Sequence, residues 1–133
     1  MNTKRRTFMK QAGIVASSAV FSPHVLIGAT RKQKDKLGVA LVGLGYYSTS
    51  ILAPALLETT KCELKGIVTG SPEKIPKWQQ DYGIEDKNIY NYQNYDQIAD
   101  NPDIDVIYVV LPPSMHAEYT IRGAKAGKHM WCE

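Results

Sequence analysis

Two glycines that follow a short apolar stretch restrict the fold of this chain more than any other feature. Residues 37–42 are predicted to form a strand, Gly43 and Gly45 follow it, and residues 49–58 have the pattern of a helix. A strand, a Gly-x-Gly turn and a helix in this order form the phosphate-binding corner of a dinucleotide-binding fold. Gly43 lets the chain turn tightly out of the strand, and Gly45 lets the backbone approach a pyrophosphate without a Cβ in the way.

Ser48 occupies the third position of this glycine motif, where glycine or alanine is usual. The residue at this position governs how closely the helix packs on the strand, so serine weakens the match without breaking it. The helix that follows is expected to point its unpaired N–H groups and its positive dipole end at the phosphates.

Strand-like and helix-like stretches alternate along the rest of the chain. The expected strands are residues 37–42, 62–69, 89–92, 106–111 and 129–132, and the expected helices are residues 49–58, 72–82, 95–100 and 116–126. The unbroken apolar run at 106–111 is typical of a strand buried on both faces of a parallel sheet. This alternation predicts an α/β fold, a doubly wound parallel sheet of the Rossmann type.

Turn residues mark the predicted helix ends. Ser71 and Ser114 are expected N-caps, whereas Gly83 and Gly127 are expected to end helices. The sequence stops at Glu133, directly after a strand has begun, although a doubly wound nucleotide domain normally continues. We therefore expect an incomplete Rossmann domain, the N-terminal fragment of a longer protein whose C-terminal substrate domain is absent.

Residues 1–29 have the features of an export signal. Basic residues at positions 4–10 precede a small-residue, mildly apolar stretch at 12–21, which is too short for a permanent membrane span, and a cleavage site is expected after Ala29. The Arg-Arg-x-Phe-Met-Lys pattern predicts recognition by the twin-arginine export machinery and a periplasmic location. A Sec signal with two chance arginines, or a frayed basic tail, is the alternative. Residues 30–36 are expected to be a polar linker, and 37–133 the globular domain.

Charge and cysteine content exclude several other classes of function. The net charge is +3, much of the positive charge lies before residue 40, and no basic stripe interleaved with aromatic residues follows, so no nucleic-acid partner is predicted. Cys62 and Cys132 do not make a disulfide framework and are expected to be small buried thiols. No further ligands stand at metal-binding spacing, so no metal site is predicted.

The end of the second predicted strand indicates which nucleotide is preferred. An NAD site places Asp or Glu here to bind the ribose 2′-hydroxyl, but this chain has Thr69, Gly70 and Ser71, followed by Lys74. A lysine attracts a 2′-phosphate, whereas a carboxylate would repel it, so the sequence favours NADP over NAD. The alternative is that Thr69 and Ser71 only cap a helix while Lys74 is solvated.

Taken together, several blocks in order resemble one known family. They are Val42-Gly43-Leu44-Gly45-x-Tyr47, Val68-Thr69-Gly70-Ser71-x-Glu73-Lys74, Leu111-Pro112-x-Ser114-x-His116-Ala117-Glu118, and Ala126-Gly127-Lys128-His129 continuing to Cys132-Glu133. The globular part resembles the glucose–fructose oxidoreductase, inositol dehydrogenase and rhizopine-catabolism family (Gfo/Idh/MocA). The likeness is greatest to its periplasmic glucose–fructose oxidoreductase members, which carry a twin-arginine signal and hold NADP tightly.

The resemblance implies a cofactor site and assigns its parts. The implied residues are Gly43, Leu44, Gly45, Tyr46 and Tyr47 at the pyrophosphate, Thr69, Gly70, Ser71 and Lys74 at the adenosine ribose and its phosphate with Tyr92 nearby, Leu111 and Pro112 under the nicotinamide ribose, His116 in the same crevice, and Glu133 at the start of the family's Glu-Lys-Pro block. Without the resemblance, His116 reads as a helix-surface histidine. No catalytic residue is assigned within the chain.

The resemblance also implies an activity, namely NADP-dependent hydride transfer to or from a sugar or polyol. The lysine and histidine that handle the proton would lie beyond Glu133, so the fragment alone is expected to be inactive, and a homo-oligomer would form through the missing C-terminal domain. Two alternatives remain. One is a nicotinamide-nucleotide-binding protein without catalysis, and the other is an NAD-dependent glycoside-cleaving member, which an acidic residue at 69–71 would have favoured.

Overall fold

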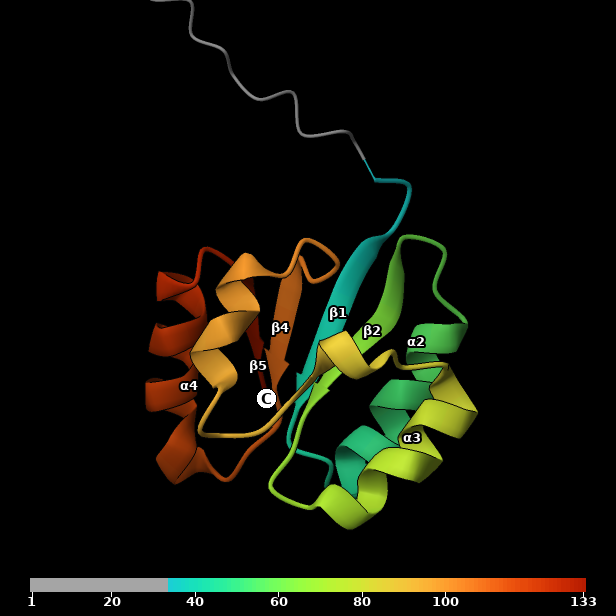
Figure 1. Cartoon of the computed structure of the whole chain (residues 1–133), viewed down its shortest axis with the longest axis horizontal. Helices are drawn as coiled ribbons and strands as arrows, with labels where there is room; N and C mark the ends of the chain where they lie inside the picture. The colour runs from blue at the N-terminus through green and yellow to red at the C-terminus, as the bar shows by residue number, and fades with distance from the viewer. Residues whose placement is uncertain (1–33) are drawn as a thin grey trace, which may run out of the picture. The chain divides into compact units, whose positions relative to one another are not determined.

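A five-stranded, all-parallel sheet forms the centre of the domain (Figure 1). The computed structural model describes residues 34–133, so the predicted signal at 1–29 and linker residues 30–33 lie outside the described residues. The strands are β1 (Leu37–Val42), β2 (Cys62–Val68), β3 (Ile89–Tyr90), β4 (Val106–Val109) and β5 (His129–Cys132). Their order in the sheet is β3-β2-β1-β4-β5, which is the order of a dinucleotide-binding domain.

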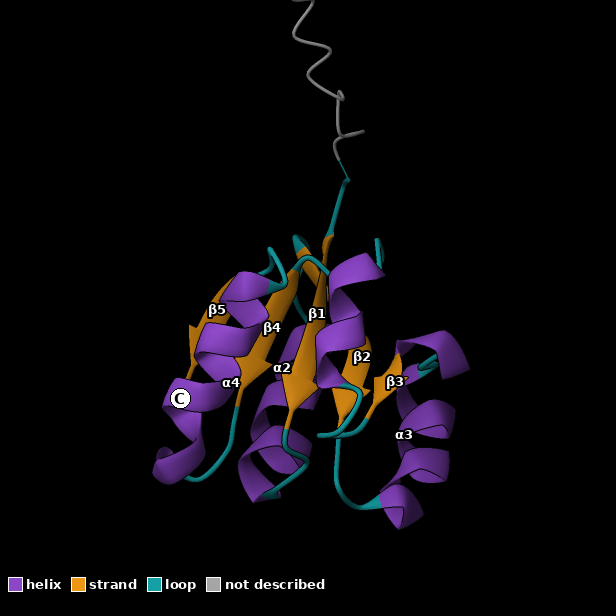
Figure 2. Cartoon of the chain, turned by 60° about the vertical axis from the view of Figure 1, so that its left-hand side comes forward, coloured by secondary structure: helices purple, strands orange, loops and turns teal. Residues whose placement is uncertain are grey.

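Helices cover both faces of this sheet, as Figures 1 and 2 show. The helical segments are a π-helical turn (Ser48–Leu52) continuous with α2 (Ala53–Leu57), a 3-10 turn (Pro72–Lys74) leading into α3 (Ile75–Tyr82), the 3-10 segments Asp86–Asn88 and Tyr95–Asp100, and α4 (Pro113–Lys125). Helices α2 and α3 pack on one face, whereas α4 and the segment Tyr95–Asp100 pack on the other. The predicted doubly wound fold is therefore confirmed.

Strand β1 separates two apolar cores. Its Ala40 and Val42 belong to the core under α4, whereas Val39 and Leu41 belong to the core under α2 and α3. Successive side chains of a strand point to opposite faces, so a strand covered on both faces must be apolar at every position. Residues 39–42 of β1 are all apolar because the strand is covered on both faces.

Of the two predicted serine caps, Ser71 lies at the N-cap position directly before Pro72, as predicted, whereas Ser114 lies inside α4. Neither Ser71 nor Pro112, the residues that precede these segments, makes a side-chain cap hydrogen bond. Proline lacks the N–H that a cap would satisfy and has the φ of a first helical residue, so α4 begins at Pro113 with Ser114 already inside it. The predicted stops are confirmed, since Gly83 and Gly127 have φ of 66° and 73°.

The prediction that both cysteines are buried thiols is wrong. Cys62 is half-buried at the start of β2, and Cys132 is exposed. Strand β5 pairs with β4 along one side, and no described strand pairs with its other side. Only Met130 of β5 packs against a core, so the neighbouring Cys132 has little to bury it among residues 34–133.

Residues of the predicted linker contact the start of the sheet. The Lys34 ammonium donates to both carboxylate oxygens of Asp105, at 2.8 and 3.0 Å, and also to the Pro102 carbonyl. The buried Asp105 carboxylate accepts a third bond from the Gly38 N–H at 2.9 Å. This carboxylate therefore fastens the chain just before β1 to the segment just before β4, at the edge of the sheet where the strands begin.

Candidate dinucleotide-binding site

Each strand ends in residues that the sequence assigns to the cofactor. The assigned residues are 43–47 after β1, 69–71 and 74 after β2, 92 after β3, 111, 112 and 116 after β4, and 133 after β5. The strands are parallel, so these residues lie at the same edge of the sheet, beyond the arrowheads in Figure 2. The strand order reverses between β1 and β4, and ligands of open α/β sheets bind at such a reversal.

The turn after β1 requires glycine at its first position. Gly43 has φ of 94°, and a Cβ there would lie 2.4 Å from the Val110 carbonyl oxygen. At Gly45 no atom lies within 4 Å of where a Cβ would stand, and the residue is exposed. The tight turn predicted at Gly43 is therefore present, while Gly45 leaves open space beside the backbone.

Ser48, at the third position of the motif, makes a hydrogen bond that glycine or alanine could not make. Its side chain is fully buried, and its hydroxyl donates to the Gly43 carbonyl at 2.5 Å. The helix spans residues 46–57 and so begins directly after Gly45, whose carbonyl accepts from the Thr49 N–H at 3.0 Å. The hydroxyl thus seats the first helical turn on the glycine turn, where the first N–H groups of a helix have no partner within it.

Lys74 joins the glycine turn to the turn after β2. Its ammonium donates to the Leu44 carbonyl at 2.8 Å, although the two residues are 30 positions apart. An ammonium carries three donors, so this contact leaves it able to bind an anion as well. The structure therefore brings together the two blocks that the sequence assigned to phosphate groups.

The turn after β2 is built on Thr69 and Gly70. The buried Thr69 hydroxyl accepts from the Ser71 N–H at 3.0 Å, and the Thr69 N–H donates to the Tyr90 carbonyl at 2.9 Å. A Cβ on Gly70 would lie 2.9 Å from a ring carbon of Tyr92, so only glycine lets that ring approach. The Thr69 hydroxyl supports the turn, and the turn itself carries no carboxylate.

An aromatic layer supports this turn from behind. The half-buried Tyr92 ring meets Tyr119 of α4 edge-on, with ring centroids 5.4 Å apart, and Tyr119 meets Tyr95 in the same way at 5.1 Å. The Arg122 guanidinium lies 5.0 Å from the centroids of both Tyr95 and Tyr119. Burial raises the pKa of Tyr92, so its phenol stays neutral at physiological pH.

His116 is fixed in the first turn of α4. Its Nε2 lies 2.5 Å from the Leu111 carbonyl oxygen. A carbonyl can only accept, so Nε2 carries a proton and donates it to this bond. A Cβ on Gly43 would lie 2.9 Å from a Leu111 methyl group, which places Leu111 against the glycine turn. Pro112, next along the chain, is exposed.

Tyr108 contacts a predicted site residue, although the sequence analysis did not single it out. Its hydroxyl donates to a carboxylate oxygen of Glu133 at 3.1 Å, and the Glu133 N–H donates to the Val109 carbonyl at 3.0 Å. Burial, together with the bond to Glu133, raises the pKa of Tyr108 to about 12. The only sequence signal was one amphipathic ring in an otherwise aliphatic strand.

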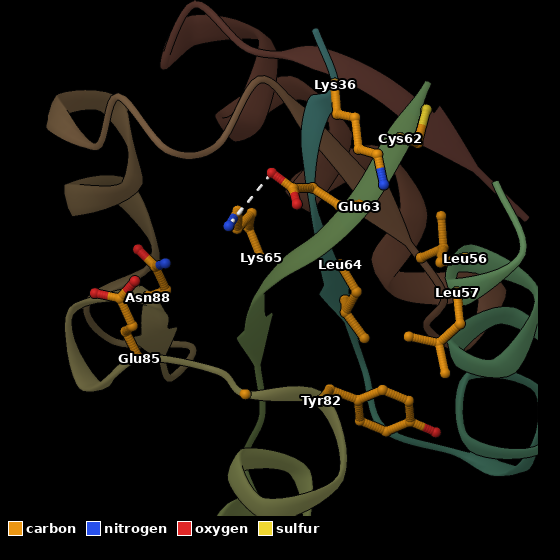
Figure 3. A pocket seen from close by; sticks show the side chains of 11 residues that line it. Lys36, Leu56, Leu57, Cys62, Glu63, Leu64, Lys65, Tyr82, Glu85 and Asn88 are labelled. Atoms are coloured by element: carbon orange, nitrogen blue, oxygen red, sulfur yellow. Dashed lines mark ion pairs between the residues drawn. The ribbon is translucent and has the colours of Figure 1, made fainter. Parts of the chain in front are cut away.

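Cavities lie on the surface of the described part of the chain. One, of about 320 Å³, lies at the ends of β2 and β3 and is lined by Thr69, Gly70 and Tyr92 among others. Another, of about 230 Å³, contains none of the predicted cofactor residues (Figure 3). Lys65 and Glu63 form an ion pair of 3.3 Å in its wall. The first cavity adjoins the candidate site.

Residues 34–133 contain neither a membrane-spanning helix nor a cluster of three metal-ligating side chains. No helix in this part of the chain has the length and apolar character that crossing a membrane requires. No three His, Cys, Asp or Glu side chains among the described residues gather closely enough to share a metal ion.

Comparisons with known proteins agree with this architecture. Residues 37–133 match the family model described as "Oxidoreductase family, NAD-binding Rossmann fold" (GFO_IDH_MocA). An aldose–aldose oxidoreductase from Caulobacter crescentus is 45% identical with a TM-score of 0.71, over 73% of this chain and 29% of that chain. A 3-ketoreductase from Actinomadura kijaniata, solved in complex with NADP, is 25% identical with a TM-score of 0.63, over 73% of this chain and 29% of that chain.

A curated relative extends the comparison to nucleotide-sugar chemistry. The dTDP-3,4-didehydro-2,6-dideoxy-alpha-D-glucose 3-reductase of Saccharopolyspora spinosa is 27% identical over 95 residues, which are 71% of this chain and 27% of that protein. The chain thus spans less than a third of the length of each of these relatives. Because the family model covers residues 37–133, the chain belongs to the Gfo/Idh/MocA oxidoreductase family and forms its NAD(P)-binding Rossmann domain.

Proposed function

We propose that this chain is the nucleotide-binding part of an NADP-dependent oxidoreductase that transfers hydride to or from a sugar or polyol. The observation that carries the choice of NADP is the position of Lys74. Its ammonium lies against the Leu44 carbonyl, beside a turn after β2 that offers Thr69, Gly70 and Ser71 but no carboxylate. A cation and hydroxyl groups suit a 2′-phosphate dianion, which a carboxylate would repel.

The residues present fit this nucleotide from end to end. The open backbone at Gly45 and the helix start at 46–48 suit a pyrophosphate. Leu111, Pro112, His116 and Glu133 lie after β4 and β5 and would hold the nicotinamide half. When bound, the nicotinamide ring supplies the hydride chemistry, while the residues of the chain bind and orient it.

The proposed substrate class follows from the family and its members. One similar structure is named for aldoses and another is a 3-ketoreductase, so a carbinol carbon of a sugar or polyol is the proposed site of oxidation. By itself the chain is expected to bind nucleotide without turnover, because the family's proton-handling lysine and histidine are not assigned within it. A homo-oligomer of the whole protein, formed through the C-terminal domain, belongs to the same proposal.

The proposal also includes export to the periplasm by the twin-arginine machinery. A cofactor held tightly suits that route, because a protein exported folded can carry its nucleotide with it. Replacing Arg5 and Arg6 together by lysine is expected to abolish export of the protein. Export that persists after this exchange, measured by cell fractionation, would contradict the twin-arginine route and favour a Sec signal.

Isothermal titration calorimetry of the whole chain with NADP and with NAD tests the nucleotide assignment directly. We expect both to bind, with NADP tighter than NAD by about tenfold or more, since one contact between an ammonium and a phosphate contributes at least ~1.4 kcal/mol. Tighter binding of NAD would overturn the choice of NADP, and binding of neither would overturn the proposal as a whole.

A further inference from the structure

The end of β4 carries a hydrogen-bonded pair that the proposed cofactor contacts do not explain. The Tyr108 hydroxyl donates to a Glu133 carboxylate oxygen at 3.1 Å. Trp131 meets the Tyr108 ring edge-on, with centroids 5.5 Å apart and planes at 88°. The ring of Tyr108 is thus held from the side, which fixes the direction in which its hydroxyl points.

Glu133 is held at two points. Its N–H donates to the Val109 carbonyl at 3.0 Å, which extends the β4–β5 pairing by one residue and fixes the backbone. Its side chain is exposed, so without Tyr108 the carboxylate would sample several rotamers. The bond from Tyr108 uses one carboxylate oxygen, and a carboxylate has lone pairs on both oxygens for further donors.

The pair lies on the nicotinamide side of the candidate site. Lys74 and Thr69, at the end of β2, mark the side where the adenosine ribose would bind. The dinucleotide crosses the sheet at the reversal between β1 and β4, so its other half lies over the ends of β4 and β5. There the Glu133 carboxylate can accept from the hydroxyls of the second ribose.

We infer that Tyr108 is a positioning residue, which holds the Glu133 carboxylate in the orientation that accepts hydrogen bonds from the nicotinamide ribose. This inference rests on the proposed function, since it presumes a bound nicotinamide dinucleotide. Tyr108 acts through Glu133 and does not itself contact the reacting atoms. Its raised pKa, about 12, keeps the phenol protonated and able to donate throughout the physiological range.

Calorimetry with two ligands separates this inference from the proposed function. NADP fills both halves of the site, whereas adenosine 2′,5′-bisphosphate fills only the adenosine half. Tyr108→Phe in the whole chain is expected to raise the Kd of NADP about fivefold, the size of one modest hydrogen bond. It should leave the Kd of the bisphosphate unchanged. Tyr82→Phe, which removes a hydroxyl from α3 away from the site, is the matched control and should change neither.

A double-mutant cycle tests whether Tyr108 works through Glu133. If it does, Tyr108→Phe has no further effect on NADP binding in a Glu133→Ala background, because no acceptor is left for Tyr108 to orient. Should Tyr108→Phe lose its fold by circular dichroism, Tyr108→Leu removes the same hydroxyl and is expected to weaken NADP alone.

Four results would overturn the inference, and they differ in what else they overturn. Wild-type affinity of Tyr108→Phe for NADP, an additive cycle, or equal weakening of both ligands would each overturn it while leaving nucleotide binding intact. Failure of the unchanged chain to bind either ligand would overturn the proposed function and the inference with it.

Discussion

One face of the sheet differs between its two halves. Over β1 and β2, this face is covered by α2 and α3, and Trp78 of α3 is 3% exposed there. Over β5, no described residue provides such cover, and Trp131 is 40% exposed. Met130, between the exposed His129 and Trp131, points to the opposite face and packs under α4. The end of β2 is therefore supported by a packed core, whereas Glu133, directly after β5, is held by backbone pairing and one tyrosine bond.

The two ends of the candidate site therefore differ in how firmly their side chains and backbone groups are held. At the adenosine end, groups such as the Thr69 hydroxyl and the Gly70 backbone are fixed by neighbours within residues 34–133. At the other end, Glu133 and Tyr108 hold each other but have solvent beside them. We expect the first half to recognise the nucleotide by itself. The second half should be more sensitive to whatever else contacts β5 in the whole protein.

The largest expected effect is on the free energy of unfolding, and it should differ between the two tryptophans. Trp78→Ala should lower the free energy of unfolding by about 3–5 kcal/mol, because it empties a buried site. Trp131→Ala should cost about 1 kcal/mol, since its ring is partly exposed and loses mainly an edge contact with Tyr108. Urea unfolding followed by circular dichroism measures both. Similar losses for the two variants would show that β5 is packed as firmly as α3.

The glycine turn gives the next largest effect and a matched control. Gly43→Ala should cost about 2 kcal/mol or more, because φ is positive and the added Cβ would collide with the Val110 carbonyl. Gly45→Ala has no such neighbour and should change stability by less than about 0.5 kcal/mol, while it weakens NADP binding. If Gly45→Ala binds NADP as well as the unchanged chain does, the pyrophosphate does not lie against that position.

The parts of this site that the sequence predicted are those set by local chemistry. Glycine is the residue type that most readily adopts positive φ, and Gly43, Gly83 and Gly127 do so. The apolar run at 106–111 predicted a strand that is covered on both faces. The cap predicted at Ser114 was wrong because Pro113 already takes the first helical position, whereas Ser71 lies at the N-cap position but makes no side-chain cap hydrogen bond.

The contacts that the sequence did not predict join residues far apart in the chain. Lys74 reaches Leu44 across 30 positions, and Tyr108 reaches Glu133 across 25. Nothing in the neighbourhood of either residue specifies such a partner, because the sheet order decides which strand ends meet. Ser48 is intermediate, since its motif position was recognised while its bond to the Gly43 carbonyl was not foreseen.

Removing the ammonium that joins the turn after β1 to the turn after β2 should affect one nucleotide more than the other. Lys74→Ala is expected to raise the Kd of NADP about tenfold and that of NAD about twofold or less, since only NADP carries the 2′-phosphate. Lys77→Ala is the matched control, because Lys77 lies on the exposed side of α3 and pairs with Asp81 at 2.7 Å. Equal losses for NADP and NAD after Lys74→Ala would show that the lysine stabilises the turn without binding the 2′-phosphate.

The smallest expected effect concerns pH and the aromatic layer behind the adenosine end. The Arg122 guanidinium donates to both Asp96 carboxylate oxygens, at 3.0 and 3.1 Å, and holds the pKa of Asp96 below its usual value. A lowered pKa in the folded state adds stability above the unfolded pKa, about 3.9, and that stability is lost as the pH falls through the lower, folded value. The Asp96 side chain is 67% exposed, although that of Arg122 is only 24% exposed, so the effect should be small and sensitive to salt. Asp96→Asn should therefore reduce stability slightly at pH 7 and not at pH 2, as measured by urea unfolding at both pH values. A loss that persisted at pH 2 would mean that Asp96 supports the tyrosine layer by packing and not by its charge.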